Sequence, residues 1–589
     1  MGRLGSVRGW DEGVDQLIQR VATGSSRGPV KMRATPALAV VVAATSLCGC
    51  PTSGSTEGTA PAASGTASTS ATVAASPTAS TSASAVPEGP IDAPGPAFTS
   101  EERVDVLIEN GIVYDGTGGP GMRAAVVLKG DEIVHVGRVA PDVKAKATID
   151  ATGMVVAPGF IDTHAHGDPA SENTNFLKMG VTTICLGQDG VSPSQDHIKS
   201  WASRYRSKRL RVNSVPFVGH GTVRGWAKVG LKKGPLDEDQ LSRMARIVGE
   251  ELDDGAWGLT TGLEYRPGAL AETSELVAIA KPVAERDGVV MSHMRSEDDD
   301  QIHAALDELL AQGTEGGARV HVSHIKVVYG KGANRADELL AKLSAAREKG
   351  ATVTADLYPY NASYTTISIV FPDWAKPPAS YSRVKRERKD ELLSFLREKV
   401  TRRNGPEATL FGSGSLAGLT LKEVAEKKGK PFEEVLAFDI GPGGASAAYF
   451  VMDDALQSRL LLDDHVMIST DGGYSSSHPR GYGSFPKIIE EYVVKREVLS
   501  IREAVRKMTG LPAETVRLTE IQRGMLKKGW AADVVVFDPK KIEARATYEK
   551  PRVYARGMEW VFVNGRAAIA KGELQKRYTG RVLLRKPRN

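Results

Sequence analysis

Residues 159–166 read GFIDTHAH, an apolar run that ends on two histidines separated by one residue. Because alternate residues of a strand point to the same side, His164 and His166 are predicted to project together from the end of a strand. Core and surface histidines can share this spacing, so the motif alone is a weak signal. Its interpretation depends on whether the rest of the chain repeats the pattern.

The pattern recurs along the chain as short apolar runs that each close on a polar residue. These runs are VTTICLGQD ending at Asp189, VNSVPFVGH at His220, WGLTTGLEY at Tyr265, GVVMSH at His293, RVHVSH at His324, TVTADLYPY at Tyr360 and HVMISTD at Asp471. Amphipathic stretches such as IHAALDELLAQG separate most of them and predict helices. Alternating strands and helices predict an α/β fold, a (β/α)8 TIM-like barrel, whose active site lies at the carboxyl ends of its strands.

The segments before and after the predicted barrel have a different residue composition. Runs such as AAVVLKGDEIVHVG before it and ADVVVFDP after it are rich in β-branched residues and turn signals, and they predict strands. We expect both chain ends to form one small flanking β-sandwich. The predicted boundaries are 103–158 and 515–585 for the sandwich, 159–514 for the barrel and about 372–464 for a charged, helical insertion beside the barrel mouth.

The first hundred residues are predicted to lie outside both domains. Residues 1–50 contain a basic segment, a short apolar run and the ending LCGC, which is typical of an export signal and resembles the lipobox of bacterial lipoproteins, with Cys50 as the acylated residue. Met1 and Met32 both remain candidate starts. Residues 51–102 are mostly Ala, Ser, Thr, Pro and Gly and predict a flexible linker. These features predict an exported protein, lipid-anchored to the bacterial cell envelope on its periplasmic or surface face.

Composition narrows the function further. The net charge of +5 over 589 residues is a weak bias, and no basic stripe with interleaved aromatic residues is present, so no nucleic-acid partner is expected. The three cysteines cannot form a disulfide framework or a thiolate zinc site, and Cys185 inside a predicted strand is expected in the core. No apolar run reaches the roughly 18 residues of a transmembrane helix. A globular enzyme or binding protein, soluble or anchored at a surface, remains.

Five of the polar strand-end residues form a ligand set suited to zinc-like ions. They are His164, His166, His293, His324 and Asp471, and the barrel topology predicts that they converge from four strand ends. The alternative is five core polar groups that are each satisfied separately. Their matching positions at strand ends favour the metal site.

These residues stand within motifs that resemble a known family. PGFIDTHAHGD, GVTTICLGQDG, VGHGTVR, GLTTGLEYRPG, MSHMRSE, VSHIK, DLYPY, STDGG with SHPRGYGSFP, and RGMLKKGWAADVVVFDP are similar, in this order over about residues 103–585, to the D-aminoacylase (N-acyl-D-amino-acid deacylase) family of the amidohydrolase superfamily. The resemblance implies a metal-dependent barrel with a flanking β-sandwich.

The resemblance also implies roles for the ligand set. His293 and His324 would hold a tightly bound zinc ion, His164 and His166 a second and weaker one, and Asp471 would be the catalytic acid/base. The family motif Gly-Asn-Cys-Gly, whose cysteine binds zinc, is replaced here by Gly187–Gly190 with Asp189 in the cysteine position. A carboxylate can coordinate or bridge one or two divalent ions, and its harder oxygen shifts preference away from soft metals.

Substrate-binding residues follow from the same motifs. Tyr265, Lys326 and Arg480 are implied to clamp a substrate carboxylate, for which the forked guanidinium and the ammonium are suited. His220 is expected either to help stabilise the oxyanion or only to support the neighbouring ligands.

The predicted function is hydrolysis of N-acyl-D-amino acids to a carboxylate and a D-amino acid, by a metal-activated water with Asp471 as general acid/base. The partner is thus a small carboxylated amide. A dipeptidase or amidase acting on peptides that end in a D-residue is the neighbouring alternative, because the clamp serves both. A cyclic-amide hydrolase is disfavoured by the three carboxylate-seeking groups. The alternative that is not an enzyme is a surface lipoprotein that binds metal without catalysis.

Overall fold

The computed structural model describes residues 89–586, and every structural statement below refers to them. The predicted export signal, Cys50 and residues 51–88 of the predicted linker lie outside this range. Among the described residues, none of the helices combines the length and the apolar character needed to span a membrane.

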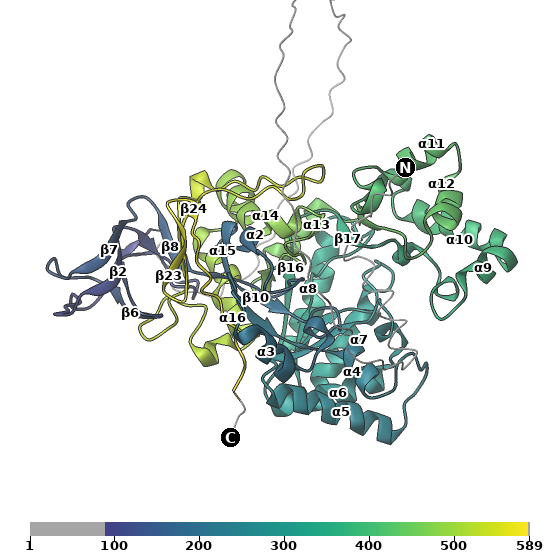
Figure 1. The fold of residues 1–589 in the computed structure, drawn as a ribbon, viewed down its shortest axis with the longest axis horizontal. Coiled ribbons are helices and arrows are strands. Elements are labelled where there is room, and N and C mark those ends of the chain that lie inside the picture. The colour runs from purple at the N-terminus through teal and green to yellow at the C-terminus, as the bar shows by residue number, and fades with distance from the viewer. Residues whose placement is uncertain (1–88, 587–589) are drawn as a thin grey trace, which may run out of the picture. The chain divides into compact units, whose positions relative to one another are not determined.

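The central domain is the predicted barrel (Figure 1). Its strands in chain order are β9 (Phe160–Asp162), β10 (Val181–Leu186), β11 and β12 (Asn213–Pro216 and Val218–Gly219), β13 (Gly258–Gly262), β14 (Val289–His293), β15 (Arg319–Val322), β16 (Val353–Leu357) and β20 (Val466–Ile468). The pairings run β9–β10–β11 and β12–β13–β14–β15–β16–β20, all parallel. The α/β barrel prediction is confirmed.

The barrel closes between its first and last strand positions. Ala165 and Gly472 form a parallel bridge, and the Asp471 amide donates to the His164 carbonyl at 2.8 Å. The buried Asp162 carboxylate accepts from the Thr470 amide at 3.0 Å. The closing seam of the barrel therefore lies directly at the predicted metal ligands.

Helices between the strands cover the barrel with apolar faces. They are α2 (Thr174–Lys178), α3 (Ile198–Arg206), α4 (His220–Trp226), α5 (Glu238–Asp253), α6 (Thr273–Glu285), α7 (Ile302–Thr314), α8 (Ala333–Glu348) and α13 (Asp454–Leu461). In α5, Met244, Ile247, Val248 and Leu252 recur at helical spacing and are buried in the main core. A capping box between Asp237 and Gln240 begins this helix.

The chain continues after β20 with helices that complete the domain. These are α14 (Arg480–Lys487), α15 (Ile501–Met508) and α16 (Gly510–Thr515). Met508 belongs to the main core, and Ala513 packs with Cys185 and Phe217 in a second cluster. The buried Cys185 side chain confirms the expectation that this cysteine is a core residue.

The flanking β-sandwich contains strands from both chain ends. Its sheets have the orders β1-β4-β3-β8-β21-β22-β23-β24 and β6-β5-β2-β7. Their bounds are β1 (Ile91–Asp92), β2 (Val104–Glu109), β3 (Ile112–Val113), β4 (Met122–Arg123), β5 (Ala125–Lys129), β6 (Glu132–Gly137), β7 (Ala145–Asp150), β8 (Val155–Pro158), β21 (Val534–Phe537), β22 (Met558–Val563), β23 (Arg566–Ala570) and β24 (Glu573–Leu574). Strand β8 pairs antiparallel with β21, so purple and yellow strands lie side by side in Figure 1.

The sandwich begins earlier in the chain than the predicted boundary at residue 103. Strand β1 pairs with β4, and Phe98 bridges to Val139 while its ring stacks on His135 at 5.0 Å. The composition of residues 51–102 predicted a linker throughout. A few apolar side chains, with Ala93 buried, are enough to fix residues 91–98 against the sheet.

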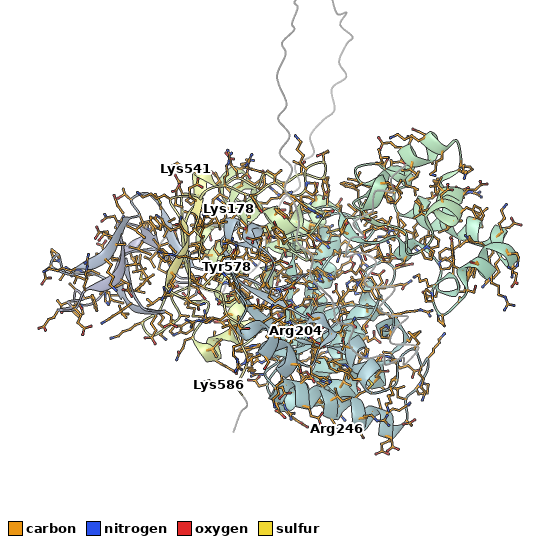
Figure 2. The ribbon with its side chains drawn as sticks, viewed as in Figure 1. Lys178, Arg204, Arg246, Lys541, Tyr578 and Lys586 are labelled. Atoms are coloured by element: carbon orange, nitrogen blue, oxygen red, sulfur yellow. The ribbon has the colours of Figure 1, made fainter. Side chains whose placement is uncertain are left out.

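The C-terminal segment also binds the barrel. Leu583 donates its amide to the Ser214 carbonyl at 2.9 Å, and its own carbonyl accepts from the Trp257 indole at 2.7 Å. On helix α2, the labelled Lys178 of Figure 2 donates to the Gly572 carbonyl at 2.7 Å. Residues 580–585, predicted as part of the sandwich, thus pack on barrel strand β11 instead.

The insertion lies between β16 and α13 and has a hydrophobic cluster of its own. Its elements are β17 (Ser363–Thr366), α9 (Tyr381–Glu387), α10 (Lys389–Arg402), β18 (Thr409–Phe411), α11 (Leu421–Lys428), α12 (Phe432–Glu434) and β19 (Ser446–Tyr449). The predicted range of 372–464 starts too late, because β17 pairs with β19. It also ends too late, because α13 packs with its apolar residues in the barrel core.

Candidate metal centre

The barrel brings the predicted ligands together at the carboxyl ends of its strands. His164 and His166 follow β9, Asp189 follows β10, and His293 ends β14. His324 follows β15, and Asp471 follows β20. Ligand atoms of His164, Asp189, His324 and Asp471 all lie within 4.8 Å of one another. The predicted convergence is therefore present in the fold.

The Asp189 carboxylate lies at the centre of this group. Its Oδ1 is 3.3 Å from His164 Nε2 and 3.6 Å from both His293 Nδ1 and His324 Nε2. Its Oδ2 is 3.5 Å from His166 Nε2. One carboxylate thus faces all four histidines, with one oxygen toward three of them and the other toward His166.

Asp471 lies between this group and a cation. Its Oδ1 is 3.2 Å from His166 Nε2, and its Oδ2 is 2.7 Å from Arg480 Nη1. Burial alone would raise the pKa of the Asp471 carboxyl, but Arg480 and the neighbouring histidines hold it well below its usual range. Asp471 is therefore ionised at neutral pH.

Three of the ligand positions have left-handed backbone conformations. The φ angles are +56° at Asp189, +38° at His324 and +45° at Asp471. Residues other than glycine rarely adopt this region, and strain of this kind concentrates at functional sites. The barrel loops hold these side chains in place against local preference.

The donor set fits a divalent metal ion. His164 is fully buried, yet neither of its ring nitrogens has a hydrogen-bond partner, and Asp189 Oδ1 is likewise without one. Buried polar atoms are normally satisfied, so these atoms require a ligand that the described residues do not supply. Imidazole nitrogens with carboxylate oxygens are suitable donors for zinc and similar ions.

Two further carboxylates, which lie in loops and do not close an apolar run of the sequence, contact the outer nitrogens of ligand histidines. Glu264 Oε2 lies 3.1 Å from His293 Nε2, and Glu297 Oε1 lies 3.0 Å from His324 Nδ1. Such outer partners orient metal-binding histidines and fix their tautomers. Both residues lie within family-like motifs, Glu264 in GLTTGLEYRPG and Glu297 in MSHMRSE, but no spacing rule distinguishes them there.

The surplus of carboxylates shifts the pKa of the ligands. Burial lowers the pKa of His293, but Asp189 and Glu264 outweigh burial and raise it to about 10. Burial raises the pKa of Asp189, whereas the charge of His164 and the nearby ring nitrogens of His293 and His324 bring it well below its usual value. The carboxylates therefore stabilise positive charge among the histidines, either as protons or as a metal ion.

Lys326 and Arg480 lie beside the cluster, as predicted. Lys326 is buried, with Nζ 2.5 Å from Glu297 Oε1 and 2.8 Å from His324 Nδ1. The ammonium of Lys326 can only donate hydrogen bonds. If His324 bound a metal ion through Nε2, its Nδ1 would carry the ring proton. That Nδ1–H would donate a hydrogen bond to Glu297 and could not accept one from Lys326. Arg480 is also buried, and its Nε has no hydrogen-bond partner.

The aromatic residue beside these two cations is Tyr358, not the predicted Tyr265. Its ring lies 4.6 Å from Arg480 Cζ and 5.8 Å from Lys326 Nζ. Its hydroxyl is buried without a hydrogen-bond partner. Tyr265 instead lies with its ring 4.7 Å from His293 and its hydroxyl 3.1 Å from Thr365 Oγ1 of the insertion.

The described contacts of His220 lead away from the metal cluster. His220 Nε2 is 2.7 Å from Glu275 Oε1, and the same buried carboxylate pairs with Arg224. These contacts join α4 to α6. Neither predicted role of His220 has a described contact behind it, so both stay predictions.

A large cavity of about 1440 Å³ opens above the cluster. Barrel residues on its wall include His166, Asp189, Glu264, His293, His324, Lys326, Tyr358, Asp471 and Arg480. The insertion contributes Tyr364, Thr365, Lys376, Tyr381 and Arg403 to the same wall. This volume accommodates a small acylated amino acid or a peptide.

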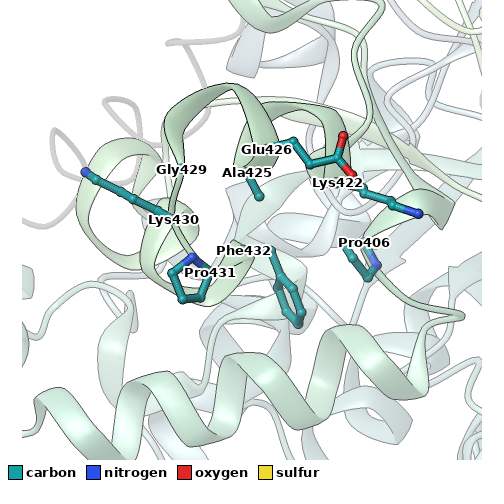
Figure 3. A pocket seen from close by; sticks show the side chains of 8 residues that line it. All are labelled: Pro406, Lys422, Ala425, Glu426, Gly429, Lys430, Pro431 and Phe432. Carbon is teal, nitrogen blue, oxygen red and sulfur yellow. The ribbon is translucent and has the colours of Figure 1, made fainter.

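A second hollow, of about 310 Å³, lies within the insertion (Figure 3). Lys422, Glu426, Lys430 and Phe432 are among the residues that line it. It contains neither a histidine nor a cysteine. The large cavity is thus the one that combines metal-ligating side chains with space for a substrate.

The fold and the site define a metal-dependent hydrolase of the barrel type. Residues 398–569 match the family model described as "Amidohydrolase family". The chain is 32% identical to a D-aminoacylase of Alcaligenes xylosoxydans xylosoxydans, over 82% of this chain and 98% of that protein. It is also 32% identical to an N-acyl-D-glutamate deacylase of the same organism, over 82% and 97% of the two chains.

Solved structures give the same result. An N-acyl-D-glutamate deacylase from Bordetella bronchiseptica, complexed with zinc and a phosphonate inhibitor, is 29% identical with a TM-score of 0.70, over 82% of this chain and all of that one. A D-aminoacylase with a binuclear metal centre is 31% identical with a TM-score of 0.69, over the same shares. The chain belongs to the D-aminoacylase family of the amidohydrolases.

Proposed function

We propose that this protein hydrolyses N-acyl-D-amino acids to a carboxylate and a D-amino acid. The observation that carries the proposal is the position of Asp471, which lies between the histidine cluster on one side and Arg480 on the other. A proton acceptor, a metal site and a carboxylate-binding cation thus meet at one point of the cavity. Similarity to D-aminoacylase and to N-acyl-D-glutamate deacylase supports the choice of substrate.

The proposed metal site has two halves that share Asp189. His293 and His324 with Asp189 Oδ1 would hold one zinc-like ion. His164 and His166 with Asp189 and Asp471 would hold a second ion. A bound ion of this kind lowers the pKa of a coordinated water to about 7 and polarises the scissile carbonyl.

Asp471 would transfer the proton. As an ionised carboxylate it accepts a proton from the attacking water and later returns it to the departing amine nitrogen. Arg480 at 2.7 Å fixes the orientation of this carboxylate. The carbon–nitrogen bond of the amide breaks as the nitrogen takes up this proton.

The substrate carboxylate would bind to the polar hydrogens that the fold leaves without acceptors. Arg480 Nε and the Tyr358 hydroxyl are both buried and unpartnered, and Lys326 adds a positive charge. A carboxylate offers the acceptors that these donors lack. Tyr358 therefore replaces Tyr265 in the proposed clamp.

A peptide that ends in a D-residue presents the same carboxylate and remains the second candidate. The cavity of about 1440 Å³ is large enough for such a peptide. The non-catalytic alternative is not retained, since the ligand set and Asp471 converge and the relatives over most of the chain are hydrolases.

We also propose export and lipid anchoring at Cys50, on the sequence pattern of residues 31–50 alone. Metabolic labelling with palmitate should mark the wild-type protein and not Cys50→Ala. Labelling that persists in the variant would reject the anchor.

The hydrolase proposal is tested with the purified full-length chain, metal-analysed and then assayed on N-acetyl-D- and N-acetyl-L-amino acids. Amine release from the D-series, abolished by chelation and restored by zinc, is expected. No hydrolysis of either series by metal-loaded protein would contradict the proposed substrate.

A further inference from the structure

Glu264 is a carboxylate in the cavity wall for which the proposed reaction has no direct use. It follows β13, lines the cavity and has 26% of its side chain exposed. Its Oε2 is 3.1 Å from His293 Nε2. No other hydrogen bond or ion pair of Glu264 occurs among residues 89–586, so Oε1 is available to a ligand.

Glu264 and the carboxylate clamp approach the metal cluster from opposite sides. Strand β13 occupies the fourth position of the eight-stranded barrel and β20 the eighth, so their ends face each other across the mouth. Arg480 lies after β20 and contacts Asp471, whereas Glu264 lies after β13 and contacts His293. Arg480 therefore supplies a cation on the β20 side and Glu264 a carboxylate on the β13 side, where the guanidinium of Arg266 also lines the wall but donates to the Pro377 and Asp373 carbonyls of the insertion.

This polarity indicates what the acyl side of the substrate carries. With the C-terminal carboxylate at Arg480 and the scissile carbonyl at the metal cluster, the acyl group extends toward β13. A neutral acyl group gains no charge interaction with Glu264. An α-ammonium group, two bonds from the scissile carbonyl carbon, would pair with it at short range.

We propose that the preferred substrates are dipeptides with a C-terminal D-residue, and that Glu264 binds their free α-ammonium group. This inference rests on the proposed hydrolase function and specifies its acyl side. Water oxygen bonds to the peptide carbonyl carbon, the carbon–nitrogen bond breaks, and its electron pair stays on the nitrogen. That nitrogen takes one proton of the water by way of Asp471, and two free amino acids leave.

Glu264 also orients His293, and the test must separate the two roles. Glu264→Gln retains an oxygen that can accept from His293 Nε2 but removes the negative charge. A purely orienting role would affect all substrates alike. A role in ammonium binding would affect only substrates that carry the ammonium group.

The substrate pair alanyl-D-alanine and N-propanoyl-D-alanine isolates that group, because the two molecules differ only by the α-amino group. We expect the metal-loaded wild-type protein to show a kcat/KM about tenfold or more higher for the dipeptide. Glu264→Gln should remove most of this ratio through KM of the dipeptide, with little change for N-propanoyl-D-alanine. Asp373→Asn, which alters another carboxylate of the same wall, should leave the ratio unchanged.

Equal kcat/KM for both substrates, or an unchanged ratio in Glu264→Gln, would overturn the inference. The wild-type measurement needs no variant, so equal kcat/KM values reject the inference even where Glu264→Gln loses metal. Hydrolysis of N-propanoyl-D-alanine without preference for the dipeptide would reject the inference and leave the hydrolase function in place. Failure to cleave either compound would instead reject the proposed function.

Discussion

Asp471 Oδ2 and Arg480 Nη1 lie 2.7 Å apart, and this ion pair joins the proposed proton acceptor to the proposed substrate-binding cation. Both side chains are buried, so the pair is held apart from competing water. A substrate whose carboxylate binds Arg480 is consequently held at a fixed position relative to the Asp471 carboxylate. Binding and proton transfer are expected to be coupled.

Removal of the Asp471 carboxylate tests its role as acid/base. Asp471→Asn should lower kcat by about 10² to 10⁴, because proton transfer by a positioned side chain contributes on this order. Metal content measured by mass spectrometry should stay close to the wild-type value at the histidine half of the site. Near-normal kcat in a metal-loaded Asp471→Asn variant would contradict the assignment.

The two tyrosines provide a matched comparison. Tyr358→Phe should raise KM for N-acyl-D-amino acids about tenfold, because it removes an unpartnered donor beside Arg480 and Lys326. Tyr265→Phe should change KM less, since its hydroxyl already contacts Thr365. Steady-state kinetics of the two variants decides between them, and the reverse order would restore Tyr265 to the clamp.

Asp189 should determine the metal preference. Asp189→Cys introduces the softer thiolate, so the affinity for cadmium should rise about tenfold or more relative to that for manganese. Competition with a chromophoric chelator measures both constants without an activity assay. Asp189→Asn, which keeps the size but removes the charge, should weaken both metals. A cadmium-to-manganese ratio unaltered by Asp189→Cys would show that Asp189 is not a ligand.

The carboxylates around His293 predict a pH dependence of the metal-free protein. The pKa of His293 is raised to about 10 from an ordinary value of 6.5. The native state therefore binds a proton more strongly than the unfolded state, and the resulting stability is present below pH 6.5 and lost as the pH rises toward 10. A bound metal ion replaces this proton and should remove the slope.

Thermal unfolding of the chelated protein between pH 6.5 and 10 measures this effect. The metal-loaded protein is the control for titrations elsewhere in the chain. Asp189→Asn should flatten the slope of the chelated form, because it removes one of the two carboxylates that hold the proton. Identical slopes with and without metal would refute the coupling.

Residues that end strands could be predicted from the sequence because their position follows from local pattern and barrel topology. His164, Asp189, His293, His324 and Asp471 each close a short apolar run, and the parallel barrel brings all such ends to one face. The fold class and the association of the two chain ends followed from equally local signals.

Contacts across the barrel mouth could not be predicted in the same way. Glu264 and Glu297 lie in loops, and only the folded barrel shows which histidine each one contacts. Tyr358 and Tyr265 both end or follow strands, so the sequence could not show which ring lies beside Arg480. The start of the sandwich at residues 91–98 depends on a few side chains within a sequence of linker-like composition.

The pairing of β8 with β21 determines the order in which the molecule can be completed. Val155 has no partner on this side of β8 until Phe537 has left the ribosome, whereas all barrel strands have been synthesised once Ile468 has emerged. The barrel can therefore begin to assemble first, and the sandwich closes last. Chains that end prematurely before residue 534 would leave the edge of β8 exposed, and such an edge is a template for aggregation.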